Sequence, residues 1–352
     1  MGLLPRDRDL NRALETLELE VDASHFRESA KGFTIRLDHF LAAHLTWRSR
    51  SSIQELIKSG AIQLDASSPD HPRGSGSYVE ERRPGRKLRQ GSQVTIVIPE
   101  ESRLAIPDED PGPLEVLFED KDCLAVDKPP GVPVHPSGRH FVGTLIQRVH
   151  HHFRQEIEAG ELAPRLCHRL DRETSGIVLV AKRARTHPEL SRQFEEREVE
   201  KEYLATVWGE LERDEGSIEL PIAQSAASTI RLKMTVREDG LPCRTDYRVV
   251  DRVPGYSLLR LRLFTGRQHQ IRVHLAAIGY PIVGDKLYGP DEQLFQRAAD
   301  GELDGEDLRL LELPRQALHN HRLVFTSSMT GERVEVTSPL AQDLEDYLTA
   351  WR

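Results

Sequence analysis

The stretch His168–Ala181, with the sequence HRLDRETSGIVLVA, decides how the rest of the chain is interpreted. Its first eight residues carry seven polar side chains, and it ends in the apolar run Ile177–Ala181. Such a run, rich in β-branched residues, is typical of a buried strand. Functional side chains are concentrated on loops that a rigid scaffold holds in place. The stretch therefore predicts a buried strand with a functional site immediately before it.

Four further blocks accompany this stretch in a fixed order: DKPPGVPVHPS (127–137), EKEYLATVWGEL (200–211), TGRQHQIRVHLAAIGYPIVGDKLYG (265–289) and LHNHRLVFTSSMTGE (318–332). With HRLDRETSGIVLVAK (168–182), they resemble the motifs of the RluA-type pseudouridine synthases from about residue 114 to the C-terminus. The resemblance implies an isomerase that breaks the bond between uracil nitrogen 1 and ribose and rejoins the sugar to carbon 5. It also implies Asp171 as the essential catalytic residue.

A carboxylate suits this reaction because it can attack the sugar, abstract a sugar proton or stabilise positive charge on the ribose. The sequence leaves these three routes open. The alternative is an aspartate that only caps the turn before a strand. A catalytic carboxylate needs a counter-charge, and the resemblance implies Arg272 for this role. Arg272 lies beside an apolar stripe of Ile271, Leu275 and Ile278 on a predicted helix, so its head can reach inward or extend to water.

Two more residues complete the predicted catalytic set. The resemblance implies that Tyr203 stacks on the target base and accepts the proton from carbon 5, although a half-buried tyrosine is common in any sheet. The resemblance also implies that Arg169, two residues before Asp171, helps to extrude the uridine and fill the gap that it leaves; the alternative is an arginine that contacts phosphate or is purely structural. His168 is expected to hydrogen-bond the loop, and Gly176 to permit a close backbone approach. Lys201 and Arg267 are interpreted as supporting or phosphate-binding residues, or else as unspecific exposed charges.

Residues 33–99 resemble the RNA-binding module of the fourth small-subunit ribosomal protein. One helix is predicted from Leu37 to Leu45, and a second runs from a capping-box pattern at Ser52 to Gly60. A short strand follows at 61–64. The resemblance, together with a basic run at 82–89, predicts phosphate contacts. The expected RNA-binding residues are Arg36, Arg48, Arg50, Lys58, Arg83, Arg86 and Lys87.

The net charge of −9 over 352 residues does not exclude RNA, because the location of charge matters more than its sum. Residues 31–99 contain 11 Lys and Arg against 6 Asp and Glu, a balance of +5, so the rest of the chain carries −14. Three scattered cysteines and no long apolar run favour a cytoplasmic protein without a membrane span. Neither a metal site nor a cofactor is predicted, because no ligand motif or nucleotide fingerprint is present.

Four regions are predicted: an N-terminal extension (1–30), the RNA-binding module (31–99), a linker (100–113) and a catalytic domain (114–352). For the catalytic domain we expect an α+β fold with a mixed, mainly antiparallel central sheet. Strands are predicted at 114–118, 123–127, 177–181, 199–208, 243–250, 256–264, 318–325 and 333–337, and helices at 143–153, 185–197 and 268–278.

These observations predict a monomeric enzyme that converts uridine to pseudouridine in structured RNA. Large-subunit ribosomal RNA is the expected substrate by analogy with the family. Two alternatives remain: a transfer-RNA pseudouridine synthase, and a non-catalytic protein of RNA binding or ribosome assembly.

Overall fold

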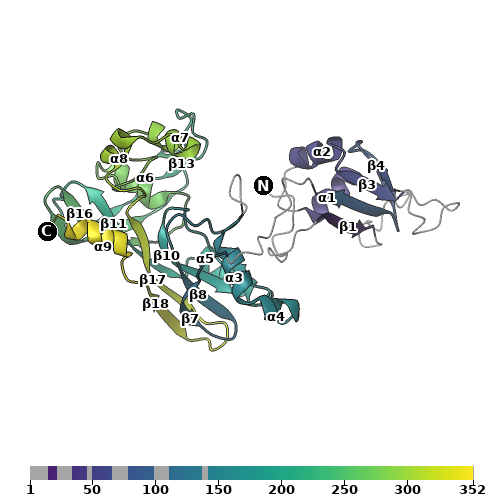
Figure 1. Ribbon diagram of the computed structural model, residues 1–352, viewed down its shortest axis with the longest axis horizontal. Coiled ribbons are helices and arrows are strands. Elements are labelled where there is room, and N and C mark those ends of the chain that lie inside the picture. Colours follow the sequence, from purple (N-terminus) through teal and green to yellow (C-terminus); the bar gives the residue numbers. More distant parts are fainter. Residues whose placement is uncertain are drawn as a thin grey trace. The chain divides into compact units, whose positions relative to one another are not determined.

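The computed structural model describes residues 15–21, 34–45, 50–65, 78–98, 111–136 and 142–351. Arg48 and most of the predicted extension and linker lie outside these ranges. The chain divides into two compact units, which are described separately: residues 1–111 with 136–142, and residues 112–135 with 143–352, as far as each is described (Figure 1).

The first unit is a small α+β structure. Its sheet has the antiparallel order β1 (Thr16–Glu20), β6 (Gln93–Val97), β3 (Ile62–Asp65) and β4 (Tyr78–Glu80), and β2 (Thr34–Arg36) pairs separately with β5 (Lys87–Arg89). Helices α1 (Leu37–His44) and α2 (Arg50–Lys58) pack on each other. Their buried residues follow the predicted apolar spacing: Leu37, Phe40 and Leu41 on α1, and Ile53, Leu56 and Ile57 on α2. The resemblance of this unit to a ribosomal protein module stays an expectation.

The predicted capping box at Ser52 is wrong. Helix α2 begins at Arg50, so Ser52 lies inside the first turn and not at its boundary. Helix ends are the least certain part of a sequence-based assignment, because the local pattern fits several starting points.

The second unit contains a ten-stranded, mixed and mainly antiparallel sheet, which confirms the predicted fold class. Its main path is β12 (Glu215–Ile218), β15 (Thr245–Val253), β16 (Tyr256–Leu263), β11 (Glu200–Trp208), β17 (Leu318–Thr326), β10 (Ser175–Ala181), β8 (Cys123–Lys128) and β7 (Glu115–Glu119). Strand β18 (Arg333–Thr337) pairs with β17, and β9 (Arg165–Leu166) pairs with β10. Only β10 and β17 pair in parallel among the described strands. The eight predicted strands all exist, displaced by a few residues at their ends.

The predicted helices are present as α3 (Leu145–His152), α5 (His187–Glu195) and α6 (Gln270–Ala277). Helix α5 packs on β10 and β17, and α6 lies against β15 and β14 (Met234–Val236), which forms a small hairpin with β13 (Ile222–Gln224). Helices α4 (Arg154–Glu158), α7 (Gln293–Asp300), α8 (Gly305–Leu311) and α9 (Gln342–Thr349) were not predicted.

No helix in the described part of the chain is long and apolar enough to cross a membrane. The described residues also contain no group of three or more His, Cys, Asp or Glu side chains arranged to hold a metal ion.

Candidate active site

The turn that carries Asp171 is fixed by the start of the buried strand β10. The backbone N–H of Thr174 donates to the carbonyl of Asp171 at 3.1 Å, and β10 begins one residue later. Gly176 has φ +107°, and a Cβ built there would lie 2.2 Å from the carbonyl oxygen of Asn320 on β17. The predicted close backbone approach at Gly176 is therefore confirmed. It lets β10 and β17 pair in parallel directly beside the turn.

Asp171 forms a partly buried ion pair with Arg272, which lies in the first turn of α6. The Nη1 of Arg272 donates to Asp171 Oδ2 at 2.9 Å. The other edge of the guanidinium donates to Asp285, with Nε to Oδ2 at 2.6 Å and Nη2 to Oδ1 at 2.8 Å. Asp285 is fully buried and also accepts the backbone N–H groups of Leu287 and Tyr288. Arg272 is therefore held on two sides and keeps one nitrogen for Asp171.

The electrostatics of this pair keep Asp171 ionised. Burial alone would raise the pKa of Asp171, but the charge and the hydrogen bond of Arg272 hold the pKa below its usual value. Burial acts to lower the pKa of Arg272, yet Asp285 and Asp171 outweigh it and raise that pKa. The pair predicted from sequence is thus present, while its catalytic role stays a prediction.

Tyr203 lies on β11, opposite Leu261 of β16 and Asn320 of β17. Its side chain is buried, and burial together with the negative charge of Asp171 raises its pKa well above the ordinary value. The phenol therefore stays protonated at neutral pH. Both roles that the resemblance implies for Tyr203, stacking on the base and accepting a proton, stay predictions.

A small cavity of about 110 Å³ joins these residues. It brings together four predicted site residues besides Arg267, and several others: Arg169, Leu170, Asp171, Thr174, Tyr203, Leu263, Gly266, Arg267, His269, Gln270, Ile271, Arg272 and Leu318. Arg169 is exposed at its edge. The Nε of Arg267 is buried and has no hydrogen-bond partner in the described part of the chain.

His168 and Lys201 do not line this cavity. The Nε2 of His168 accepts the backbone N–H of Leu179 at 3.0 Å, and its ring stacks on Phe194 at 4.5 Å. Burial lowers the pKa of His168 to about 3, so the ring is neutral and supports the loop, as predicted. Lys201 is buried, with its Nζ 6.0 Å from the centre of the Phe194 ring.

Lys128 ties the upstream Pro-Gly loop to the catalytic turn. Its Nζ is buried and donates to the carbonyl oxygens of Pro129, Val132 and Arg172 at 2.9–3.0 Å. The N–H of Gly131 also donates to the Arg172 carbonyl, at 2.9 Å. Burial lowers the pKa of Lys128 to about 7. The Lys128 amine therefore joins the Pro-Gly loop to the turn that carries Asp171, although the two lie far apart in the sequence.

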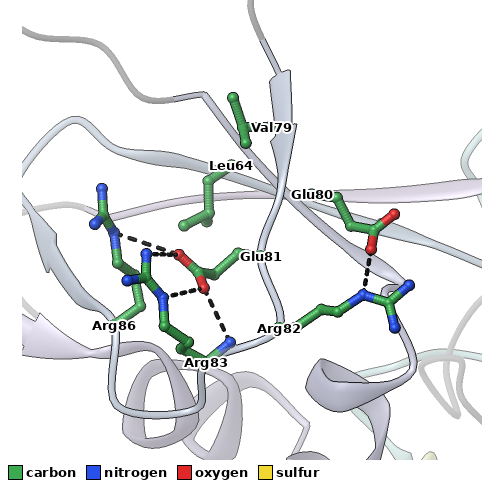
Figure 2. Close-up of a pocket in the computed structure, with 7 residues that line it drawn as sticks. All are labelled: Leu64, Val79, Glu80, Glu81, Arg82, Arg83 and Arg86. Atoms are coloured by element: carbon green, nitrogen blue, oxygen red, sulfur yellow. Dashed lines mark hydrogen bonds and ion pairs between the residues drawn. The ribbon is translucent and has the colours of Figure 1, made fainter.

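The predicted RNA-binding arginines of the first unit are paired with carboxylates. Arg36 donates to the fully buried Asp38 at 2.9 and 3.0 Å, and Arg50 lies 3.7 Å from the same carboxylate. Arg83 and Arg86 both bind Glu81, with Nε to carboxylate-oxygen distances of 2.9 and 3.6 Å (Figure 2). These two arginines line a cavity of about 350 Å³. Its other lining residues are Leu64, Val79, Glu80, Glu81 and Arg82. Lys58 and Lys87 are exposed.

Three residues of the site were missed by the sequence analysis: Asp285, His269 and Lys128. Asp285 and Lys128 lie inside the quoted motifs, GDKLYG and DKPPG, but nothing in the local pattern states that they are buried. His269 stands three residues before Arg272, and this spacing on one helix end was a usable signal for a shared site.

Comparison with known proteins identifies relatives of the whole chain. Residues 122–277 match the RNA pseudouridylate synthase family. An uncharacterized RNA pseudouridine synthase of Aquifex aeolicus is 38% identical over 257 residues, covering 72% of this chain and 77% of the relative. A protein named ribosomal large subunit pseudouridine synthase D, from Xanthomonas campestris, is 36% identical over 345 residues, covering 97% of this chain and 96% of the relative.

A solved structure resembles this chain as well. Human RNA pseudouridylate synthase domain containing 1 matches with a TM-score of 0.52 and 26% identity, covering 70% of this chain and 97% of the human one. The sequence motifs, the α+β sheet and the relatives agree, and the chain belongs to the RNA pseudouridine synthase family.

Proposed function

We propose that this protein isomerises specific uridines to pseudouridine in large-subunit ribosomal RNA, with Asp171 as the essential catalytic residue. The observation that carries the catalytic assignment is the ion pair between Asp171 and Arg272 in the cavity that Tyr203 and Arg169 also line. The ribosomal substrate is supported by relatives that carry the name ribosomal large subunit pseudouridine synthase D, at 31–36% identity over most of the chain.

The dimensions of the cavity suit a single base. Its volume of about 110 Å³ is smaller than the roughly 300 Å³ at which pockets for whole ligands begin. The target uridine must leave its stack to reach Asp171, since chemistry on a stacked nucleotide is blocked by its neighbours. In our proposal the uracil stacks on Tyr203, Arg169 holds the opening in the RNA, and the unpaired Nε of Arg267 contacts ribose or phosphate.

Arg272 serves Asp171 in two ways in this proposal. It keeps the carboxylate ionised in a buried place, and it fixes the direction of Oδ2. The second oxygen, Oδ1, has no hydrogen bond to any described residue, so it is the atom left to act on the sugar. Each of the three possible routes requires such an ionised, accessible oxygen.

We further propose that the first unit contributes RNA affinity and not chemistry. Its arginines at 36, 50, 83 and 86 remain between 42% and 73% exposed despite their carboxylate partners, so each has N–H groups directed to solvent. Arg83 and Arg86 flank a cavity whose lining includes Leu64 and Val79, an arrangement in which a nucleotide can contact apolar surface while its phosphate meets guanidinium groups (Figure 2). A monomer acting in the cytoplasm is part of the same proposal.

The substrate is tested by chemical mapping of pseudouridine across all stable RNAs, in cells with and without the protein. Loss of modification in large-subunit ribosomal RNA is the expected result. Loss of pseudouridine only from transfer RNA would instead identify the protein as a transfer-RNA pseudouridine synthase, the main alternative. Such an enzyme would have the same active site and different RNA contacts. An unchanged map, together with retained RNA binding, would favour a non-catalytic role in ribosome assembly.

The catalytic assignment is tested with Asp171→Asn. This change keeps the shape of the side chain but removes its charge, so the single-turnover rate should fall on the order of 10⁴-fold while RNA affinity is largely retained. Asp346→Asn, an exposed aspartate on α9, is the matched control and should leave the rate unchanged. Full turnover by the Asp171 variant would overturn the assignment.

A further inference from the structure

His269, at the start of α6, has a backbone conformation that its surroundings must impose. Its φ and ψ are 56° and 18°, in the left-handed region, where a residue with a side chain is strained by about 1–2 kcal/mol. Strained residues persist where the neighbouring structure holds them, and they cluster at functional sites. The side chain of His269 is only 10% exposed and lines the cavity with Asp171. The residue in this strained conformation therefore has its imidazole in the proposed active site.

The hydrogen bonds of Tyr288 determine which ring nitrogen of His269 carries the proton. The backbone N–H of Met234 donates to the Tyr288 hydroxyl at 2.9 Å, and the Nδ1 of His269 lies 2.8 Å from the same oxygen. The single proton of that hydroxyl has no other acceptor in the described part of the chain, so Tyr288 donates to Nδ1. Burial and the nearby Arg272 lower the pKa of His269 to about 4, so the ring is neutral. Its own proton is therefore on Nε2.

The Nε2–H group lies beside the Asp171 carboxylate but does not form a hydrogen bond with it. Nε2 lies 3.8 Å from Asp171 Oδ2, which is beyond hydrogen-bonding distance. Asp171 Oδ2 already accepts from Arg272. A donor at this place, inside the cavity and next to the group that meets the sugar, lies within reach of the base attached to that sugar.

We propose that His269 is a further catalytic residue, whose Nε2–H donates a hydrogen bond to the uracil when the glycosidic bond breaks. This inference rests on the proposed function. In the step, the bond from C1′ to N1 breaks and its electron pair stays on the ring. The negative charge spreads over N1 and the two carbonyl oxygens, while Asp171 acts on the ribose by one of its three possible routes. His269 transfers no proton in this step, and it donates a hydrogen bond to a carbonyl oxygen as the charge on that oxygen grows.

His269 can accelerate the cleavage because its N–H is already positioned before negative charge develops on the uracil. A neutral N–H, fixed by Tyr288 in a site with little water, stabilises a developing oxyanion without reorganisation. Arg272 already uses three of its five N–H groups on Asp285 and Asp171. His269 adds a donor, Nε2–H, that neither carboxylate engages.

The test uses the full-length protein and a ribosomal RNA fragment in single-turnover assays. His269→Gly accepts the left-handed backbone but lacks the donor, so the rate constant should fall about 100-fold with RNA affinity unchanged. His269→Asn also tolerates this backbone and carries an amide N–H, so it should recover part of the rate. Tyr288→Phe should cause a smaller loss, because the proton is then no longer fixed on Nε2. An unchanged rate in His269→Gly, or a loss only in affinity, would overturn the proposal.

A second substrate separates a donor from a merely structural residue. In RNA with 5-fluorouridine, the electron-withdrawing fluorine stabilises the departing ring, so the defect of His269→Gly in consuming the nucleotide should shrink. An equal defect with both bases would mean that His269 only positions Asp171, and would overturn the proposal. The failures are distinguishable: a wild-type protein without pseudouridine formation sinks the proposed function, whereas an active wild type with an equally active His269→Gly sinks this inference alone.

Discussion

Arg272 is the residue on which the geometry of the site depends most directly. It uses two nitrogens to bind Asp285 and one to bind Asp171, and all of these bonds are 2.6–2.9 Å long. A planar guanidinium can make these contacts at once, whereas a lysine offers a single point charge. The position of the carboxylate and its ionisation are therefore controlled by one side chain.

This control predicts a shift in the pH dependence of the reaction. Because Arg272 lowers the pKa of Asp171, the wild-type carboxylate stays ionised well into acid. In Arg272→Gln, burial is less opposed, the pKa of Asp171 rises, and the acidic limb of the single-turnover rate should move to higher pH. Arg272→Lys keeps a positive charge, so its acidic limb should lie between those of the wild type and Arg272→Gln. Thermal melting checks that each variant folds, and identical acidic limbs would contradict the prediction.

At this scale the sequence identifies side chains by their motif but not their contacts. Asp171, Tyr203 and Arg272 stand in recognisable blocks, and the structure brings them to one cavity. Asp285 could not be predicted as the anchor of Arg272, because its burial results from the turn at 285–288 and not from any periodicity. The raised pKa of Tyr203 was equally hidden, since it depends on burial and on the negative charge of Asp171.

Among the elements, the junction of β10 and β17 tolerates the least change. Gly176→Ala would place a methyl group 2.2 Å from the carbonyl oxygen of Asn320, in a backbone conformation that alanine rarely adopts. We expect a loss of unfolding free energy on the order of 3 kcal/mol or more, from strain and overpacking together. Loss of activity should accompany it, since the turn carrying Asp171 leads into this junction.

A matched control for this prediction is Gly279→Ala. Gly279 also has a positive φ, of +86°, but a Cβ there would meet nothing within 4 Å. The Gly279→Ala substitution should therefore lower the free energy of unfolding only by the backbone strain, about 1–2 kcal/mol. Chemical denaturation of both variants, followed by circular dichroism, measures the difference. Equal destabilisation would mean that the close approach to Asn320 contributes nothing.

Element prediction succeeded where the hydrophobic pattern was strong. Strand β16 alternates as expected, with Leu259, Leu261 and Leu263 buried and Arg260 and Arg262 exposed. Helix α6 was predicted, but more of it is buried than its apolar stripe indicated, because the polar residues Gln270, Arg272 and His274 are buried as well. Helix α8 was missed within an acidic region, although Asp304 and Asp307 form a capping box that marks its start.

On the scale of the whole molecule, residues 31–99 carry a charge balance of +5 and the rest of the chain carries −14. The arginines of the first unit share their charge with Asp38 and Glu81, so the phosphate binding that we propose would depend on N–H groups that remain exposed. The overall charge of −9 therefore says little about RNA affinity. In our proposal, RNA affinity is decided by the local field around Arg36, Arg50, Arg83 and Arg86.

Salt dependence of RNA binding tests this view. Arg83→Gln or Arg86→Gln should weaken binding and reduce the slope of log affinity against log salt by about 0.7–0.9 for each phosphate that the variant no longer neutralises. The single-turnover rate at saturating protein should not change, because neither residue lines the cavity of Asp171. Arg309→Gln, an exposed arginine of α8 beside Glu306, is the control and should leave the slope unaltered. A slope unchanged in all three variants would exclude phosphate binding by Arg83 and Arg86.

The double use of Asp285 has a consequence for how activity is gained during folding. The same carboxylate accepts the backbone N–H groups of Leu287 and Tyr288 and anchors the guanidinium that pairs with Asp171, the proposed catalytic residue. A molecule in which this segment has not closed has an Arg272 without its anchor. Catalytic competence should consequently require closure of residues 285–288, so that turnover after dilution from denaturant does not recover before this segment has closed.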